Sequence, residues 1–213
     1  MFDYNCDLAQ EYGVYKDLEQ YERAKYVSSV NIACGFHSGD PISIKKALEF
    51  AKENNLSIGA HIGFQDIAGF GKNKMNLEPE ALEALIVYQL SALSAFAKSL
   101  SLEIENVRLH GAMSEMFHED IEYAKFVATV IKKFNPWLNL FVKSFEFKKI
   151  IEEEIGINCA YEEIFKEGSS LREFRECENK PDSLHFVSAE CAKRAYEVKK
   201  PTPVNYNRVG AQI

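Results

Sequence analysis

The sequence has no surplus of positive charge. Its 25 lysine and arginine residues are outnumbered by 32 aspartate and glutamate residues, which gives a formal net charge of -7 at pH 7. Proteins that bind nucleic acid use a basic face to contact the phosphates. The charge balance therefore predicts that nucleic acid is not a partner.

Other signals are scarce as well. No apolar run approaches the roughly 20 residues that are needed to cross a bilayer. The opening MFDYNCD lacks the basic and apolar stretches of a signal peptide. The cysteines are odd in number and form no CxxC pair, which indicates reduced thiols; they are Cys6, Cys34, Cys159, Cys177 and Cys191. We expect a cytoplasmic protein with no membrane partner, in which Cys6 and Cys34 are buried as small apolar residues.

What the sequence does contain is an alternation of strand-like and helix-like segments. The strand-like runs are FDYNCD, YVSSVNIACG, LSIGAH, NVRLHG, LNLFV, GINCAY and LHFVS. Helical spacing is found over residues 41–55, 77–100, 119–134, 145–155 and 189–198. The pattern predicts one α/β domain over residues 1–213, folded as an irregular (β/α) barrel of about seven parallel strands. An open doubly wound sheet gives the same pattern and is the alternative.

Histidine is rare, and three of the five histidines share one context. His37, His61 and His110 each end a predicted strand and have a glycine within two residues, and Asp7 ends the first strand. In parallel β/α proteins the carboxyl ends of the strands meet on one face, where ligands bind. We therefore expect Asp7, His37, His61 and His110 to form a catalytic site.

Two asparagines are expected to bind substrate beside these residues. Asn5 precedes Asp7 by two residues, so both side chains point to one face of the strand. Asn31 lies on the next strand, in NIACGFHSGD. Asp40 before a proline is instead typical of a helix N-cap. His118 and His185 lack the glycine context and are interpreted as surface or core residues.

A long glycine-rich loop over residues 59–75, GAHIGFQDIAGFGKNKM, separates a strand from a helix. Loops of this length in a compact domain are usually functional. We expect Asp66 to bind substrate and Lys72 to bind a phosphate or carboxylate. A lid with solvated lysines is the alternative. The phosphate-loop pattern GxxxxGK[ST] is absent from the sequence.

Four segments in order, DYNCDLAQEYG, SSVNIACGFHSGDP, GAHIGFQDIAGFGKNKM and RLHGAM, resemble the motifs of the LamB/YcsF family of 5-oxoprolinase A subunits. The resemblance implies a barrel related to glycoside hydrolase and deacetylase barrels. It implies ATP-dependent opening of 5-oxoproline (pyroglutamate) to glutamate, with ATP as co-substrate and two other oxoprolinase subunits as partners.

The chain departs from the family pattern at several positions. Ala9 and Gln10 stand where the family has glycine and glutamate, and Lys72 stands where arginines are usual. Tyr161 and Glu162 occupy the place of an acid and an arginine, and VSAE replaces Val-His-Gly-Asp. The predicted site therefore resembles the family more closely in its N-terminal half than in its C-terminal half.

The retained residues suit a lactam hydrolase. A lactam resists water, and phosphorylation of its carbonyl oxygen by ATP would make it a better electrophile. Asp7 or one of the three histidines could act as the general base toward water. Two alternatives stay open. One is a deacetylase-like hydrolase in which the carboxylate and imidazoles hold a divalent metal. The other is a non-catalytic homologue that binds a small carboxylate or a partner protein.

Overall fold

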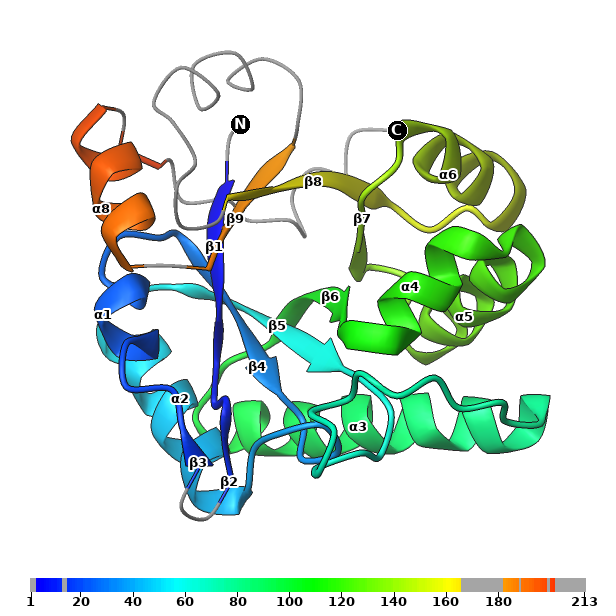
Figure 1. The fold of residues 1–213 in the computed structure, drawn as a ribbon, viewed down its shortest axis with the longest axis horizontal. Helices are drawn as coiled ribbons and strands as arrows, with labels where there is room; N and C mark the ends of the chain where they lie inside the picture. Colours follow the sequence, from blue (N-terminus) through cyan, green and yellow to red (C-terminus); the bar gives the residue numbers. More distant parts are fainter. Residues whose placement is uncertain (1–2, 13–14, 166–181, 188, 199, 202–213) are drawn as a thin grey trace.

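The structure, a computed structural model, describes residues 3–12, 15–165, 182–187, 189–198 and 200–201. Within them, seven parallel strands close into a barrel, and the last strand pairs with the first (Figure 1). In barrel order the strands are β1 (Asp3–Leu8), β4 (Ser29–Ala33), β5 (Ser57–Ile62), β6 (Ile104–Leu109), β7 (Asn139–Val142), β8 (Cys159–Phe165) and β9 (Ser183–Phe186). The predicted barrel is confirmed, and the open sheet is excluded.

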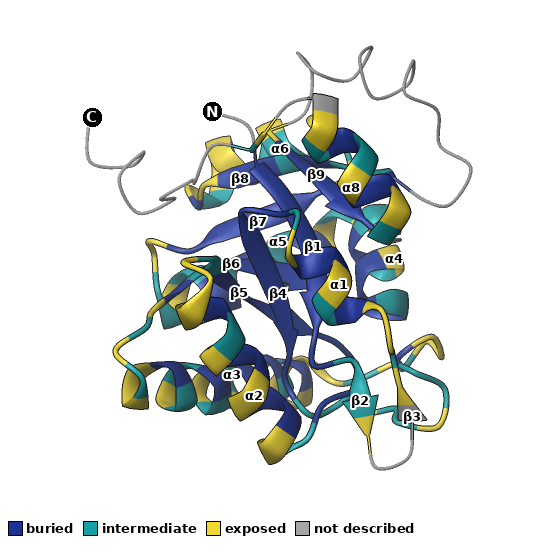
Figure 2. Ribbon diagram, turned by 90° about the vertical axis from the view of Figure 1, so that its left-hand side faces the viewer, coloured by how far each residue is buried: buried dark blue, intermediate teal, exposed yellow. Residues whose placement is uncertain are grey.

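Helices follow the strands and cover the outside of the barrel (Figures 1 and 2). They are α1 (Gln20–Ala24), α2 (Pro41–Glu53), α3 (Pro79–Ser99), α4 (Gly111–Glu119), α5 (Ile121–Phe134), α6 (Phe145–Ile150) with a π-helical turn (Ile151–Ile155), and α8 (Ala189–Val198). Figure 2 shows buried strands inside and helices with exposed outer faces, as expected for amphipathic helices on a barrel.

Three elements were not predicted: the hairpin of β2 (Glu11–Tyr12) and β3 (Tyr15–Lys16), helix α1, and helix α4. Each strand of the hairpin has two residues, which is too few to show a period of two. Helix α4 begins at Gly111, which has a positive φ of 50° and therefore looks like a turn in the sequence.

Helix α2 begins as predicted. The Asp40 carboxylate accepts hydrogen bonds from the backbone N–H groups of Ile42, at 2.9 Å, and Ser43, at 2.8 Å. The Ser43 hydroxyl in turn accepts the Asp40 N–H, which completes a capping box after which Pro41 occupies the first turn. Asp40 is thus an N-cap residue.

Helix α3 is the one described segment that length and composition would allow to cross a membrane. No such run was expected from the sequence. The helix packs on β5, β6, α2 and α5 and buries one stripe of its surface: Leu82, Ile86, Gln89, Leu90, Leu93 and Ala97. This packing is that of a helix on the core of a globular domain.

Cys6, Cys34 and Cys159 are free thiols, Cys191 is buried, and Cys177 lies outside the described residues. Burial raises the pKa of Cys34 to about 12. Burial also raises the pKa of Cys6 far above its usual value. The two residues are therefore inert apolar members of the core, as predicted.

Candidate functional site

A buried ion network joins three strands across the mouth of the barrel. Arg108 on β6 contacts Asp7 on β1, with Nη1 at 3.3 Å from Oδ2 and 3.4 Å from Oδ1. The Nε of the same guanidinium donates to both carboxylate oxygens of Glu162 on β8, at 3.1 and 3.0 Å. All three side chains are buried. One arginine therefore compensates two carboxylates in a place where an unpaired charge would be costly.

The charge state of Asp7 follows from these contacts. Burial alone would raise the pKa of its carboxyl group. The positive charge of Arg108, together with His61 and His185, outweighs burial and holds the pKa well below its usual value. Asp7 is an anion at neutral pH.

Asn5 links the first and last strands of the barrel below Asp7. Its amide N–H groups donate to the Ser183 hydroxyl at 2.8 Å and to a Glu162 carboxylate oxygen at 3.2 Å. Its carbonyl oxygen accepts from Asn31 and from His185 Nδ1, both at 2.7 Å. Asn5 and Asn31, predicted to bind substrate, thus position their neighbours in the structure; their direct contact with substrate stays a prediction.

His185, interpreted from the sequence as a surface or core residue, is buried within the site. Because Nδ1 donates to the Asn5 oxygen, the lone pair of the neutral ring is on Nε2, 3.6 Å from Asp7 Oδ2. Burial, followed by the nearby charge of Arg108, lowers its pKa well below the usual value. The imidazole is therefore neutral, and its Nε2 is available as a base.

The three predicted histidines lie against one another. The rings of His37 and His110 stack with centroids 3.9 Å apart, and the His61 ring meets both edge-on. His61 Nε2 lies 3.2 Å from Asp7 Oδ2 and 2.9 Å from His110 Nδ1. The structure thus brings Asp7, His37, His61 and His110 together from four different strand ends.

Hydrogen bonds to the backbone determine where the protons of two rings lie. His61 Nδ1 is 3.2 Å from the Arg108 carbonyl, and His110 Nε2 is 2.7 Å from the Phe70 carbonyl, so both nitrogens carry hydrogen. Burial, then the charge of His61, lowers the pKa of His110 to about 3, so His110 Nδ1 carries a lone pair. His61 Nε2 therefore faces the lone pair of His110 Nδ1 on one side and the Asp7 carboxylate on the other. A proton or a metal ion at His61 Nε2 would satisfy both.

The same atoms form the metal-binding candidate of the described residues. One ring nitrogen from each of His37, His61 and His110 lies within 4.8 Å of the others. Both ring nitrogens of His37 are buried without a hydrogen-bond partner. In metal sites the second nitrogen of a ligating histidine commonly donates to a carbonyl, as those of His61 and His110 do here. The donor set therefore fits a divalent ion such as Zn²⁺.

The predicted loop is packed onto these rings. The Asp66 carboxylate accepts from the N–H groups of Gly69 and Asn73, at 2.9 and 3.2 Å, and ties the loop to itself. Gly71 has a φ of 66°, and a Cβ atom there would lie 2.7 Å from His37 Cβ and 2.8 Å from His110 Cδ2. The loop is a fixed roof over the histidines, which is why glycine is needed at residue 71.

A cavity of about 280 Å³ opens above the ion network. Its walls include Asp7, Gln10, Asp17, Arg23, Phe70, Arg108, His110, Lys143 and His185. His37 and His61 are almost fully buried and do not line it; they contact the wall residues Asp7 and His110 from behind. Asp66 and Lys72 do not line it either, and their predicted roles in binding stay predictions without support from these contacts.

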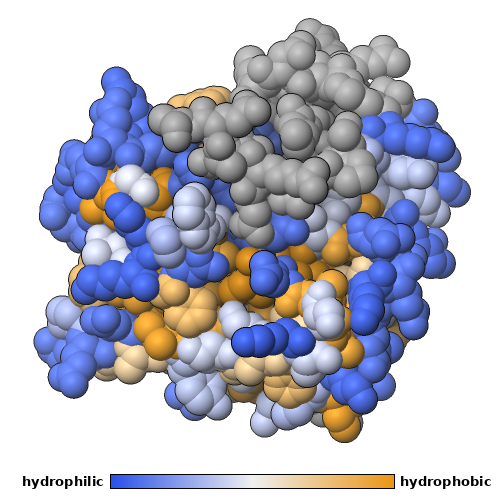
Figure 3. Space-filling model, turned by 180° about the vertical axis from the view of Figure 1, so that it is seen from behind, coloured by the Kyte–Doolittle hydropathy of each residue, from blue (hydrophilic) through white to orange (hydrophobic). Residues whose placement is uncertain are grey.

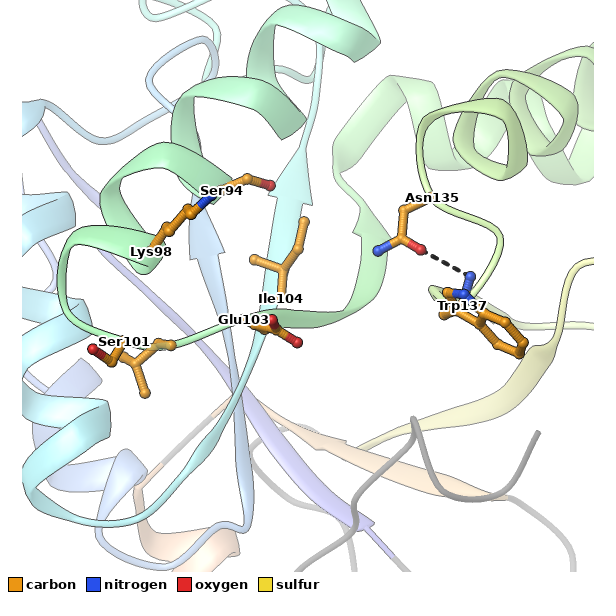
Figure 4. A pocket seen from close by; sticks show the side chains of 8 residues that line it. Ser94, Lys98, Ser101, Glu103, Ile104, Asn135 and Trp137 are labelled. Carbon is orange, nitrogen blue, oxygen red and sulfur yellow. Dashed lines mark hydrogen bonds between the residues drawn. The ribbon is translucent and has the colours of Figure 1, made fainter. Parts of the chain in front are cut away.

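A larger cavity lies at the other end of the barrel, where β6 and β7 begin (Figure 4). Ser94 and Lys98 of α3, Glu103, Asn135 and Trp137 are among its walls. None of these side chains is buried, and the polar contact drawn there, Trp137 N–H to Asn135 Oδ1 at 3.0 Å, is local. Its described walls therefore hold no buried ionic group that could perform chemistry.

Sequence reasoning missed five residues of the site: Gln10, Arg108, Lys143, Glu162 and His185. Arg108 precedes His110 by two residues on β6, so the period of two would have placed it on the face of the predicted site. Gln10 replaces the glutamate of the family and donates from Nε2 to Asp7 Oδ2 at 3.2 Å. Lys143 and His185 follow or end strands that carry no glycine signal.

The structure shows what Ala9 and Glu162, two of the residues that depart from the family pattern, do in this chain. Ala9, where the family has glycine, keeps a positive φ of 57°, so the backbone conformation is the one that favours glycine. Glu162 is a buried partner of Arg108. Within VSAE, Ser188 lies outside the described residues. From the C-terminal half of the chain, Glu162 and His185 contribute to the described site.

Comparison with known proteins agrees with the fold and the motifs. The chain is 41% identical over 160 residues to the 5-oxoprolinase A subunit of Pyrococcus abyssi and 39% identical to that of Bacillus subtilis. These matches cover 75% of this chain and 63% and 62% of the relatives, so the chain spans less than two thirds of their length.

The crystal structure of the lactam utilization protein from Thermus thermophilus superimposes with a TM-score of 0.81 at 29% identity, over 91% of this chain and 93% of that one. Residues 2–177 match the profile of the LamB/YcsF family. With this match over most of its length, the chain belongs to the LamB/YcsF family.

Proposed function

We propose that the chain is the A subunit of an ATP-dependent 5-oxoprolinase, which opens 5-oxoproline to glutamate together with two other subunits. The observation that carries this proposal is the buried Asp7–Arg108–Glu162 network beneath a small cavity, in a chain similar to proteins named as the A subunit of 5-oxoprolinase. A cavity near 280 Å³ is at the lower end of the roughly 300–1,000 Å³ of ligand sites, and it suits a single small ring.

The cavity residues can serve the steps of this reaction. ATP transfers its terminal phosphoryl group to the lactam oxygen and leaves as ADP, and water adds to the activated carbon. Cleavage of the C–N bond then leaves glutamyl phosphate, which a second water hydrolyses to glutamate and phosphate. We assign proton acceptance from water to Asp7 or the neutral His185, because both line the cavity. The guanidinium of Arg108 stabilises negative charge that develops on oxygen.

The nucleotide is expected to come from a partner. The sequence has no GxxxxGK[ST] loop, and a cavity of about 280 Å³ is small for a nucleotide beside the lactam. We therefore expect the isolated chain not to release glutamate from 5-oxoproline and ATP, and the three-subunit assembly to release it.

The test is an assay of glutamate release by the chain alone and by the assembly. Asp7→Asn and His61→Ala should each lower the rate of the assembly by about 10² or more, since each removes a member of the proton network. Glu119→Gln, which alters an exposed ion pair with Lys74, is the matched control and should retain the rate. Brisk release by the lone chain, or none by the assembly, would contradict the proposal.

A metal-dependent hydrolase is the second candidate, favoured by the His37–His61–His110 cluster and by the two partnerless nitrogens of His37. A divalent ion there would polarise a carbonyl or activate water. Elemental analysis of the purified chain, and melting curves with Zn²⁺, Mn²⁺ and Mg²⁺, test this candidate. A bound ion, lost in His61→Asn and His110→Asn, would support it. An ion-free chain whose melting temperature no metal raises would exclude it.

A further inference from the structure

One cation in the cavity wall makes no direct ion pair with the described residues of the site. Arg23 pairs with Asp17, and Arg108 with Asp7 and Glu162. Lys143, the third cation of the wall, has no ion pair in the part of the chain that the structure describes. Lys143 is therefore the cation of the wall that no described carboxylate contacts directly.

Helix α4 holds Lys143 in place from two sides. The Lys143 backbone N–H donates to His118 Nε2 at 2.9 Å, and His118 Nδ1 donates to the Ser114 carbonyl at 2.7 Å. One neutral tautomer of His118 satisfies both bonds, and burial lowers its pKa in agreement. The Lys143 ammonium donates to the Ser114 hydroxyl at 3.0 Å. The ammonium has three N–H groups, so it can bind a ligand without leaving Ser114.

We propose that Lys143, held in place by the Ser114 hydroxyl, binds the carboxylate of the lactam substrate. The inference rests on the proposed function and adds to it the residue that selects lactams bearing a carboxylate. Lys143 follows β7, two positions in barrel order from β9 and next to β6, so its ammonium and Arg108 belong to neighbouring strand ends. The carboxylate would sit at Lys143 while the ring amide lies over Asp7 and Arg108.

Charge matching favours a carboxylate over a phosphate. Lys143 offers one positive charge that no described carboxylate contacts directly, which suits the single negative charge of 5-oxoproline, whereas the phosphates of ATP carry several. A remaining N–H of the Lys143 ammonium can donate a charge-assisted hydrogen bond to a carboxylate oxygen.

The test compares two ligands that differ only in the carboxylate: 5-oxoproline and 2-pyrrolidinone. Their binding to the full chain is measured by calorimetry for the unmodified protein, Lys143→Met and Lys143→Arg. Lys143→Met should weaken binding of 5-oxoproline about ten- to a hundredfold and leave 2-pyrrolidinone unchanged, the range for a hydrogen bond to a charged group. Lys143→Arg should retain most of the affinity for 5-oxoproline.

Two further variants control for indirect effects. Ser114→Ala removes the hydroxyl and should weaken binding of 5-oxoproline less than tenfold. Lys133→Met removes a cation near the end of α5, away from the cavity wall, and should leave both affinities unchanged. Inorganic phosphate as competitor should displace 5-oxoproline only weakly; a phosphate affinity lost in Lys143→Met and exceeding that for 5-oxoproline would overturn the assignment.

Binding and turnover separate this inference from the proposed function. Carboxylate-dependent binding that Lys143→Met abolishes, with no glutamate release from any assembly, supports the Lys143 site and contradicts the oxoprolinase. Glutamate release with an unchanged KM for 5-oxoproline in Lys143→Met supports the oxoprolinase and overturns the Lys143 site. Absence of any 5-oxoproline binding by the unmodified chain overturns the Lys143 site as well.

Discussion

Arg108 is the residue on which the electrostatics of the mouth depend. Replacing it with methionine would leave the Asp7 and Glu162 carboxylates buried beside each other without a cation. Breaking a buried pair from one side costs about 3–5 kcal/mol. We expect Arg108→Met to lower the free energy of unfolding by about that amount at pH 7, as measured by urea denaturation.

The control is Arg194→Met, which removes a half-exposed partner of Glu190 on α8 and should change stability by less than about 1 kcal/mol. The penalty of Arg108→Met should shrink in acid, where protonated carboxyl groups no longer need a cation. Equal stability of the two variants at pH 7 would show that the network is open to water.

Replacement of Gln10 by glutamate tests whether the site binds a metal cation. A glutamate at this position, which the family usually has, would place a second carboxylate beside Asp7, where the Gln10 amide now donates at 3.2 Å. Repulsion should destabilise Gln10→Glu by roughly 1 kcal/mol, or about 2–4 °C in melting temperature. Addition of Zn²⁺ or Mn²⁺ should restore the loss if the imidazole cluster and the carboxylates bind a metal. If neither metal changes the melting temperature of Gln10→Glu, the result would favour a site that functions without a metal ion.

Among the elements of the fold, the roof loop and the histidine cluster form one packed unit. Gly71 accepts no side chain, because a Cβ atom would press on both His37 and His110, and its φ is positive. We expect Gly71→Ala to cost more than about 2 kcal/mol, since left-handed strain of about 1–2 kcal/mol adds to overpacking of about 1–3 kcal/mol. Thermal melts measure the loss.

Gly156 provides the matched control. It also has a positive φ, 72°, but a Cβ there would meet only the end of the flexible Lys132 side chain, at 3.1 Å. Gly156→Ala should therefore cost the backbone strain alone, about 1–2 kcal/mol. If both variants lose the same stability, the loop does not press on the histidines.

Across the molecule as a whole, the barrel is assembled from side chains of many elements. Hydrophilic residues surround a central gathering of hydrophobic residues on the face seen in Figure 3, and exposed large apolar side chains are scattered, including Leu18, Ile42 and Trp137. The interior of the barrel contains three neutral histidines, and their proton binding determines how the free energy of unfolding depends on pH.

His37, His110 and His185 all have pKa values lowered first by burial. Below about pH 6.5 the unfolded chain binds protons that the folded chain excludes, so stability falls as the pH falls. Each histidine lowers the free energy of unfolding by up to about 1.4 kcal/mol per pH unit, so the three together lower it by up to about 4 kcal/mol per pH unit. Asp7, with its lowered pKa, adds a further loss only below about pH 4, where its unfolded form becomes protonated.

Urea denaturation at pH 7.5, 6.5 and 5.5 checks this prediction. The free energy of unfolding should fall steeply between the last two values. In His185→Gln the slope should be smaller by about one proton, or about 1.4 kcal/mol per pH unit. A slope below that of a single histidine in the unmodified chain would mean that the rings are protonated in the fold.

Local patterns in the sequence were enough to predict the barrel, its parallel strands and four groups of the site. Hydrophobic period and length identify strands and helices locally, and glycine near His37, His61 and His110 marks strand ends. The carboxyl ends of parallel strands must meet, so these residues and Asp7 were placed together without coordinates. Asp40 as an N-cap is equally local.

Which of these groups face the ligand became clear only from the closed fold. His37 and His61 are buried behind Asp7 and His110, while Arg108, Lys143 and His185 complete the mouth. The ion pairs join residues 54 and 101 positions apart, as in Arg108 with Glu162 and with Asp7. No local pattern contains such a pair, because charge compensation depends on distances across the barrel that closure alone establishes.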